Sequence, residues 1–249
     1  MTDPSTASQS IKLETLLQLL QDGQIEIQGL LPNGSNYTFF ALVSQADMRT
    51  FAVYKPTRGE QPLWDFPEET LALREVAAYL TSEALGWSFV PPTIYRTDGP
   101  HGPGSLQYYV QAQADYHYFT LDEADKAAVL PRVALFDLLV NNADRKGGHI
   151  LKDTHDKLWL IDHGICFNTQ PKLRTVVWDF GGQPIPAELL DDLADFRRRL
   201  DDDADLKAAF KSLLSTAEVQ ALRRRADRLL ASRHFPEPGP GRNYPWPPL

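Results

Sequence analysis

The chain has 249 residues, 43% of them hydrophobic, which is enough for one two-lobed domain or two small ones with a substantial core. Its 25 Lys and Arg residues against 33 Asp and Glu give a net charge of −8, which argues against broad nucleic-acid binding and against anionic lipid surfaces. Because no run of about 18 apolar residues is present, we expect no integral membrane association.

Residues 1–10 are polar and lack the basic start and apolar stretch of a secretory signal, so we expect a disordered leader. Cys166 is the single cysteine, which excludes an intramolecular disulfide and suits a cytoplasmic location. Because it is flanked by Ile165 and Phe167, Cys166 is predicted to be a small core residue rather than a reactive thiol.

The first part of the chain predicts a short helix followed by antiparallel strands. Apolar residues between positions 11 and 20 recur at helical spacing, and Gly23 suits the helix end. A turn is expected at Asp47 and Met48, and the segment 111–115 is expected to be the hinge between two lobes. Strands are predicted at residues 24–30, 38–44, 51–55, 90–96 and 106–112.

Between the first two strands, Gly34, Ser35 and Asn36 form a short polar turn. Glycine allows close backbone approach, and successive N–H groups can form an anion-binding nest, so these residues are candidates for covering nucleotide phosphates. Asn-Gly is also the commonest hairpin turn, which leaves a purely structural interpretation open.

Lys55 ends the third predicted strand, where its ammonium group could reach nucleotide phosphates. Such a lysine needs an acid on the following helix to orient it, and that helix is predicted to start near Pro67 and to stop at Gly86. Glu75 is the favoured partner of Lys55. Glu68 and Glu69 could compete for the role.

A polar loop follows the predicted helices at 119–130 and from Pro131 to Val140. In the protein-kinase catalytic loop the base Asp precedes a metal-binding Asn by five positions, and a Lys often lies two positions after the Asp. Asp144, Lys146 and His149 occupy those three positions.

Two short apolar segments, 149–152 and 157–161, flank a turn at residues 154–156 and predict a hairpin that ends on Asp162. A loop acid followed by a hairpin that presents a second acid is the layout of a phosphoryl-transfer centre. Asp144 would orient the attacking group, and Asp162 would hold the metal on the nucleotide phosphates.

The rest of the chain is predicted to be mostly helical, with an activation-type segment at 167–174 and substrate-lining residues at 173–178. The tail, residues 235–249, contains six prolines and should be extended, either free or packed along the body. The helices are predicted at residues 187–200, 204–214 and 216–231.

The motifs around Asp144 and Asp162 resemble the phosphatidylinositol 3-/4-kinase-like branch of the kinase fold, particularly an uncharacterised bacterial branch. HipA-type kinases share an Asp-Arg-His-x-x-Asn version of the loop, and type II phosphatidylinositol 4-kinases are similar along residues 161–167. The resemblance covers roughly residues 25 to 180. His149 stands where the family has Asn.

The resemblance implies an α+β, two-lobed kinase-like fold, with an antiparallel-sheet N-lobe at 11–112 and a mostly helical C-lobe at 113–234. It implies an ATP-dependent phosphotransferase that uses Mg²⁺ or Mn²⁺ and an unidentified acceptor, with a protein or small-molecule hydroxyl as plausible as a lipid. The implied roles are catalysis by Asp144 and Lys146, nucleotide binding by Gly34, Ser35, Asn36, Lys55 and Glu75, and metal binding by His149 and Asp162.

Two alternatives remain open from the sequence. Because imidazole is a poorer Mg²⁺ ligand than an amide oxygen, His149 favours a regulatory nucleotide-binding pseudokinase. A metallohydrolase that uses His149, His155, Asp162 and His163 fits less well, because no two of these residues lie at the i and i+4 spacing of a metal site on a helix. If His149 keeps the ordinary pKa of about 6.5 and binds metal, activity should fall as the pH drops through roughly 6.

Overall fold

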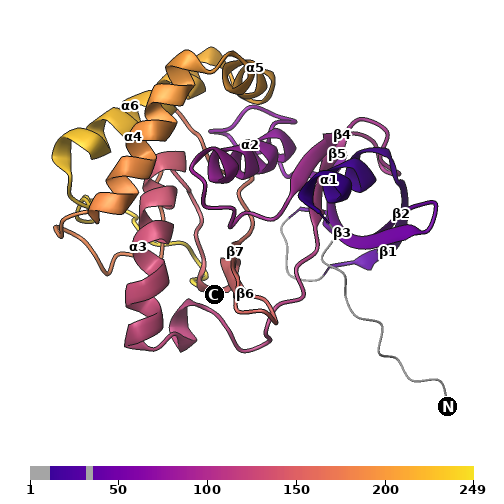
Figure 1. Ribbon diagram of the computed structural model, residues 1–249, viewed down its shortest axis with the longest axis horizontal. Coiled ribbons are helices and arrows are strands. Elements are labelled where there is room, and N and C mark those ends of the chain that lie inside the picture. Colours follow the sequence, from indigo (N-terminus) through magenta and orange to yellow (C-terminus); the bar gives the residue numbers. More distant parts are fainter. Residues whose placement is uncertain (1–11, 32–35) are drawn as a thin grey trace.

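The computed structural model describes residues 12–31 and 36–249, so the leader, Gly34 and Ser35 lie outside the described residues. A five-stranded sheet and a group of helices form two lobes that meet around α2 (Leu71–Ala84) and the β6–β7 hairpin (Figure 1). The strands of the sheet are β1 (Gln24–Leu30), β2 (Phe39–Gln45), β3 (Met48–Pro56), β4 (Thr93–Arg96) and β5 (Gly104–Tyr108).

The sheet is antiparallel throughout, in the order β1-β2-β3-β5-β4. Successive side chains of a strand point to opposite faces of the sheet. On the central strands, the side chains of one face pack against α1 (Leu13–Asp22) and form a core. The turn before β3 occupies Ala46 and Asp47, so Met48 already belongs to the strand, contrary to the sequence prediction. The core under α1 consists of Leu16, Leu19, Leu20, Ala41, Val43, Ala52, Tyr54 and Leu106.

Helix α2 starts at Leu71 with Thr70 before it, not near Pro67 as the sequence predicted. Glu69 has a φ of 60°, a left-handed conformation that is incompatible with a continuing helix at that position. Helix α2 ends at Ala84, and Gly86 follows with a φ of 73°, as expected for a glycine just beyond a helix end.

A single helix, α3 (Glu123–Val140), runs through Pro131, although two helices were predicted there. The Asp122 side chain caps it by accepting a hydrogen bond from Asp125 N at 2.8 Å. Proline removes one backbone hydrogen bond inside a helix. Burial of most of the residues after Arg132, including Phe136 and Leu139, offsets that loss.

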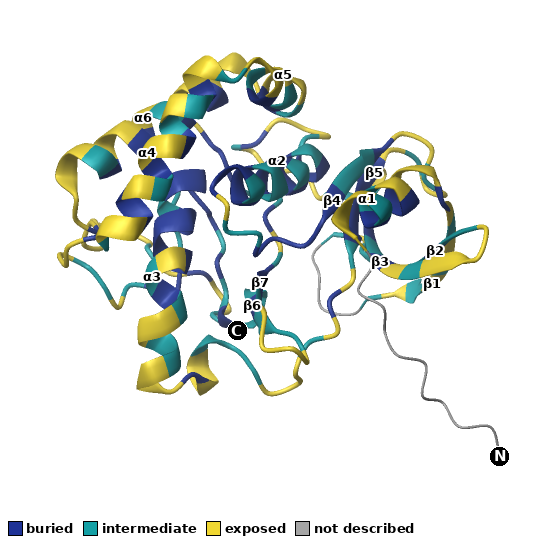
Figure 2. Ribbon diagram, viewed as in Figure 1, coloured by how far each residue is buried: buried dark blue, intermediate teal, exposed yellow. Residues whose placement is uncertain are grey.

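The remaining helices, α4 (Ala187–Asp202), α5 (Ala204–Leu213) and α6 (Thr216–Ser232), agree with the sequence prediction to within two residues. Their outer faces are exposed, whereas α2 and the second half of α3 are largely buried (Figure 2). No helix within residues 12–31 and 36–249 is both long enough and apolar enough to cross a bilayer.

The hairpin of β6 (Ile150–Lys152) and β7 (Leu158–Leu160) is present as predicted and lies between the sheet and the helices. The proline-rich tail is packed rather than free. Asn243 O accepts hydrogen bonds from Thr175 N and Trp178 Nε1, both at 3.1 Å, and Pro248 O accepts one from Gly147 N at 2.8 Å.

Candidate active site

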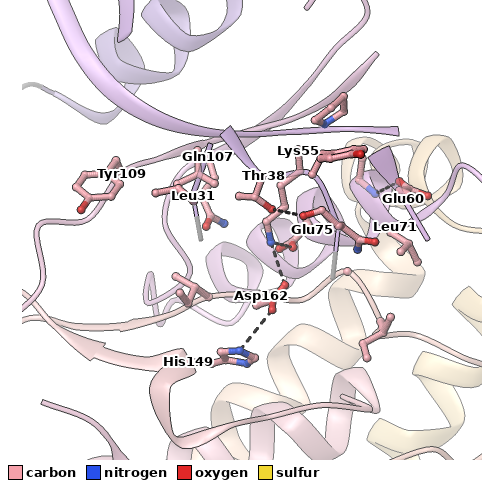
Figure 3. Close-up of a pocket in the computed structure, with 18 of the residues that line it drawn as sticks. Leu31, Thr38, Lys55, Glu60, Leu71, Glu75, Gln107, Tyr109, His149 and Asp162 are labelled. Atoms are coloured by element: carbon pink, nitrogen blue, oxygen red, sulfur yellow. Dashed lines mark hydrogen bonds and ion pairs between the residues drawn. The ribbon is translucent and has the colours of Figure 1, made fainter. Parts of the chain in front are cut away.

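A cavity of about 340 Å³ lies between the sheet and the β6–β7 hairpin, and most of the residues predicted for the site line it (Figure 3). This volume is within the range of small-molecule sites. Its polar lining includes Asn36, Lys55, Glu60, Glu75, Gln107, Asp144, His149 and Asp162, and its apolar lining includes Leu31, Val53, Val110, Leu151 and Ile161.

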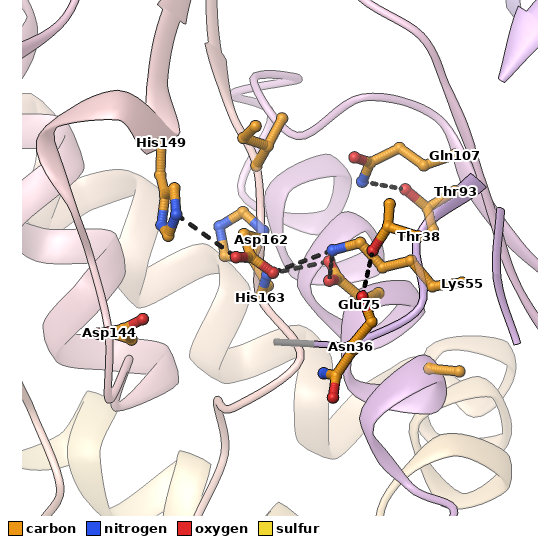
Figure 4. A network of polar contacts seen from close by, with 12 residues as sticks. Asn36, Thr38, Lys55, Glu75, Thr93, Gln107, Asp144, His149, Asp162 and His163 are labelled. Carbon is orange, nitrogen blue, oxygen red and sulfur yellow. Dashed lines mark hydrogen bonds and ion pairs between the residues drawn. The ribbon is translucent and has the colours of Figure 1, made fainter. Parts of the chain in front are cut away.

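Lys55 extends from the end of β3 to two carboxylates. Its Nζ lies 2.5 Å from Glu75 Oε1 and 3.0 Å from Asp162 Oδ1. Both contacts are drawn as dashed lines in Figure 4. Burial alone would lower the pKa of Lys55, but the carboxylates of Asp162 and Glu75 raise it above its ordinary value. Lys55 is therefore a fixed cation at one end of the cavity.

Glu75 is the partner of Lys55 that the sequence favoured, and Glu68 and Glu69 are exposed in the turn before α2. The Glu75 side chain is buried and uses both oxygens: Oε1 pairs with Lys55, and Oε2 accepts a hydrogen bond from His163 N at 2.9 Å. One carboxylate thus joins the sheet to the backbone after Asp162.

The loop after α3 is held by a buried ion pair. Asn141 ends the helix with a φ of 56°, which turns the chain toward the hairpin. The Arg145 guanidinium then donates to both oxygens of Asp137 on α3, at 3.0 and 3.1 Å, and both side chains are fully buried. Arg145 also donates to Ile161 O at 3.0 Å and lies 2.8 Å from His163 Nε2. These contacts fix the loop relative to the end of the hairpin.

Asp144 protrudes from this loop into the cavity and is set apart from the Lys55–Glu75–Asp162 contacts (Figure 4). Lys146 Nζ lies 3.6 Å from Asp144 Oδ2. Partial burial raises the pKa of Asp144 to about 6, despite the opposing effect of Lys146 and, more weakly, of Arg174. Arg174 lies alongside because its backbone N–H bonds to Asn142 O and its carbonyl accepts from Arg145 N, each at 2.9 Å.

His149 faces the second acid, with Nε2 at 3.4 Å from Asp162 Oδ2. Burial lowers the pKa of His149 to about 4, so the expectation that it titrates near 6.5 is wrong. The Lys55 ammonium holds the pKa of Asp162 well below its ordinary value. A neutral imidazole nitrogen beside an ionised carboxylate is a donor pair that fits a divalent cation.

The described residues contain no group of three or more His, Cys, Asp or Glu side chains that could hold a metal by itself. A divalent ion at His149 and Asp162 would therefore need further ligands, such as nucleotide phosphates. The four residues of the metallohydrolase alternative are likewise not gathered into one such group. His155 is exposed at the hairpin turn, and His163 is buried against Arg145.

Of the three residues predicted to cover the phosphates, Asn36 lines the cavity, and its Oδ1 accepts a hydrogen bond from Gln61 N at 2.7 Å. The segment 111–115, predicted to be the hinge, lies in the connection between β5 and α3. Residues 107–110 just before it line the cavity, and Gln113 N bonds to Lys152 O of the β6–β7 hairpin at 2.8 Å.

Arg145 and Gln107 were not predicted as site residues. Gln107 lies inside the predicted strand 106–112, and nothing in the sequence marks a strand residue as part of a cavity lining. The position of Arg145 directly after Asp144 was its one signal in the sequence. Cys166 is buried as predicted, and burial raises the pKa of its thiol well above the ordinary value.

No family model matches the sequence. Among solved structures, the chain is similar to the Golgi casein kinase, with a TM-score of 0.53, 14% identity, and coverage of 88% of this chain and 74% of that chain. It is also similar to the Helicobacter pylori proinflammatory kinase CtkA, with a TM-score of 0.52, 13% identity, and coverage of 87% and 94%. The fold is therefore a two-lobed α+β kinase fold with an antiparallel-sheet N-lobe and a mostly helical C-lobe.

Curated relatives extend this comparison. Phosphatidylinositol 4-kinase gamma 4 of Oryza sativa is 33% identical over 43% of this chain and 22% of its own length, and the Arabidopsis thaliana protein of that name is 32% identical over 54% and 28%. The match thus spans about a quarter of these plant proteins. Protein Rv2133c of Mycobacterium tuberculosis is 39% identical over 264 aligned positions, which cover 92% of this chain and 94% of its own length. The chain belongs to the family of Protein Rv2133c.

Proposed function

We propose that this protein is an ATP-dependent phosphotransferase of the phosphatidylinositol 3-/4-kinase-like type. One observation carries the proposal: Lys55 is paired with both Glu75 and Asp162 in a cavity that also contains Asp144. Phosphoryl transfer needs positioning and charge neutralisation more than covalent chemistry. A fixed cation and two carboxylates in different environments supply both.

The nucleotide base would lie between the sheet and the hairpin. Leu31 and Val53 provide one apolar wall, and Leu151 and Ile161 provide the other. Backbone groups of Val110 at the cavity edge would meet the base. With the base placed there, the phosphates point toward Lys55, and Asn36 with Gly34 and Ser35 would cover them.

Asp162 and His149 would hold Mg²⁺ or Mn²⁺ against the phosphates. The ion would neutralise charge on the phosphate oxygens when bound. Asp162 is suited to this role because it remains ionised beside Lys55, and His149 because its imidazole stays neutral near neutral pH.

Asp144 would act on the acceptor. Its carboxylate would accept the proton of the acceptor hydroxyl as that oxygen bonds to the terminal phosphorus and the bond to ADP breaks. Lys146, 3.6 Å away, would neutralise charge on the moving phosphoryl group. A base with a pKa of about 6 is ionised at neutral pH and still basic enough to hold a proton transiently.

In this proposal, residues 11–112 form the nucleotide-binding N-lobe and residues 113–234 form the C-lobe. The leader comprises residues 1–10 and the tail residues 235–249.

The match to the plant phosphatidylinositol 4-kinases supports the family type, and it covers about a quarter of their length. The acceptor is proposed as a hydroxyl group of a protein, small molecule or lipid. The assembled Lys55–Glu75 pair favours an enzyme over a pseudokinase.

The test is ATP turnover by the purified full chain. Labelled ATP is supplied with Mg²⁺ or Mn²⁺, and ADP release and phosphate incorporation into the protein or added hydroxyl compounds are measured. Wild type should consume ATP, and Asp144→Asn should not, although it still binds ADP. Nucleotide binding without turnover under any condition would favour the pseudokinase, and absence of binding would reject the proposal.

A further inference from the structure

Arg74, the residue before Glu75 on α2, is buried in the interface between the lobes with only 1% of its surface exposed. Its Nη1 donates to Cys166 O at 2.7 Å, and its Nη2 forms an ion pair with Glu218. Its guanidinium also lies 5.0 Å from the centre of the Phe66 ring. A buried arginine with its donors directed at specific partners holds those partners in place.

Arg74 and Glu75 together hold the segment that follows Asp162. Glu75 Oε2 accepts from His163 N at 2.9 Å, and Arg74 Nη1 donates to Cys166 O, three residues further on. Two neighbouring residues of one helix therefore fix the N–H at the start and the C=O at the end of the same short segment. The orientation of Asp162 depends on that segment.

The segment is bracketed by two residues in an unfavourable backbone conformation. Asp162 has a φ of 62° and Phe167 a φ of 66°, in the left-handed region that residues other than glycine rarely adopt. Such conformations persist where surrounding contacts fix them, and they occur at functional sites. The contacts of Arg74 and Glu75 lie between these two positions.

The other end of the Arg74 contact is anchored in the helical lobe. Glu218 is in the first turn of α6, where its carboxylate accepts from Ser215 N at 2.9 Å and from Ser215 Oγ at 2.7 Å. These bonds hold the carboxylate that pairs with Arg74. Helix α2, which lies between the sheet and α4–α6 in Figure 1, is thus bound to α6 as well as to the sheet.

We propose that Arg74 is a positioning residue: anchored by Glu218, it holds the segment 162–167 in the conformation that presents Asp162 to a divalent metal. The proposal rests on the function proposed above. It adds that metal binding by Asp162 also depends on Glu218 in α6, through Arg74. Without Arg74, Cys166 O loses its partner and the segment is free to leave the left-handed conformation at Asp162.

The test compares Arg74→Met with Arg96→Met. Arg96 is a matched control because it is also buried, at 5% exposed, and bonds two backbone carbonyls, those of Leu20 and Gly23, and one carboxylate, that of Asp98. It lies on β4, outside the lining of the cavity. Both variants should lose comparable thermal stability. Arg74→Lys, which keeps the charge, should recover part of the loss at the metal site.

Two readouts separate positioning from stability. The first readout is the affinity for ADP in the presence of Mn²⁺, measured by calorimetric titration. In Arg74→Met this affinity should fall about tenfold, as it does when a residue that orients a metal ligand is removed. In Arg96→Met it should change less than about twofold. Amide hydrogen exchange of residues 163–167, without nucleotide or metal, should be faster in Arg74→Met than in Arg96→Met. Glu218→Gln, which removes the anchoring charge with little change of shape, should shift both readouts in the same direction.

Equal Mn²⁺–ADP binding and equal exchange in Arg74→Met and Arg96→Met would overturn the inference. If wild type itself fails to bind ADP with Mn²⁺, the proposed function is rejected, and the hydrogen exchange still decides whether Arg74 holds the segment. If Arg74→Met does not fold, Glu218→Gln decides by the same comparison, and unchanged exchange in that variant overturns the inference.

Discussion

Lys55 Nζ lies 3.0 Å from Asp162 Oδ1, although 107 positions separate the two residues in the chain. The contact joins the end of β3 in the sheet to the end of the β6–β7 hairpin. With Glu75 as the third member, it brings together in one cavity the cation proposed to bind the nucleotide and the acid proposed to bind the metal. This arrangement has consequences that can be measured.

Replacing Lys55 with Met should weaken ATP binding by roughly 10- to 100-fold, because hydrogen bonds to charged groups contribute about 1.5–3 kcal/mol. It should also lower the melting temperature of the nucleotide-free protein, since buried Glu75 loses its counterion. Calorimetry and thermal denaturation measure the two effects. Unchanged ATP affinity would show that Lys55 does not contact the nucleotide.

Activity should have an acid limb near pH 6 that belongs to Asp144. As a base, Asp144 must be ionised, and burial raises its pKa to about 6, so kcat/KM should fall about tenfold per pH unit below that value. Lys146 lowers the pKa of Asp144, and therefore Lys146→Gln should move the limb to higher pH while also reducing the rate. A pH–rate profile from about pH 4.5 to 8 tests both expectations.

His149→Asn is the control for this assignment. The pKa of His149 is lowered to about 4, so removing the imidazole should leave the limb near pH 6 in place. If the acid limb disappears in His149→Asn, the imidazole is the group that titrates near pH 6, which would contradict the role given to Asp144.

The same substitution should change the metal preference. Mn²⁺ accepts nitrogen ligands more readily than Mg²⁺, and His149 offers a nitrogen beside the Asp162 carboxylate. In His149→Asn an amide oxygen replaces that nitrogen, so the ratio of Mg²⁺- to Mn²⁺-supported turnover should rise. An identical ratio in both proteins would place His149 outside the metal site.

The Asp137–Arg145 pair should dominate the stability of the loop that follows α3. Both side chains are fully buried, and Asp137→Asn leaves the Arg145 guanidinium without its counterion. Removing one partner of a buried pair costs about 3–5 kcal/mol, which corresponds to a fall in melting temperature of about 10 °C in a chain of this size. Arg197→Met, at the surface pair with Asp201, should cost about 1 kcal/mol or less. Similar losses in both variants would contradict this assignment.

The sequence predicted the parts of the fold whose signals are local. Alternation located β1, helical spacing located α4 to α6, and the spacing from Asp144 to Asp162 located the loop and the hairpin. The predictions failed at two element boundaries. Pro131 remains inside α3, whose second half is buried in the helical lobe, and α2 starts late because Glu69 adopts a left-handed conformation.

The site was predictable as a set of residue types but not in its electrostatics. Lys55, Glu75 and Asp162 could be named from their order along the chain. The lowered pKa of His149 could not be predicted, because it results from burial of the side chain, which is known only from the folded chain. The roles of Arg74 and Arg145 were equally hidden, since their partners, Glu218 and Asp137, are identifiable only in the folded chain.

The most direct test of the account compares Asp162→Asn with Asp144→Asn in the binding of ADP with and without Mn²⁺, together with ATP turnover. Asp162→Asn should lose the part of ADP binding that depends on Mn²⁺. Asp144→Asn should keep that binding and lose turnover by about 10²- to 10⁴-fold, as expected for a general base. Equal loss of Mn²⁺-dependent binding in both variants, or full turnover in Asp144→Asn, would contradict the division of roles between the two acids.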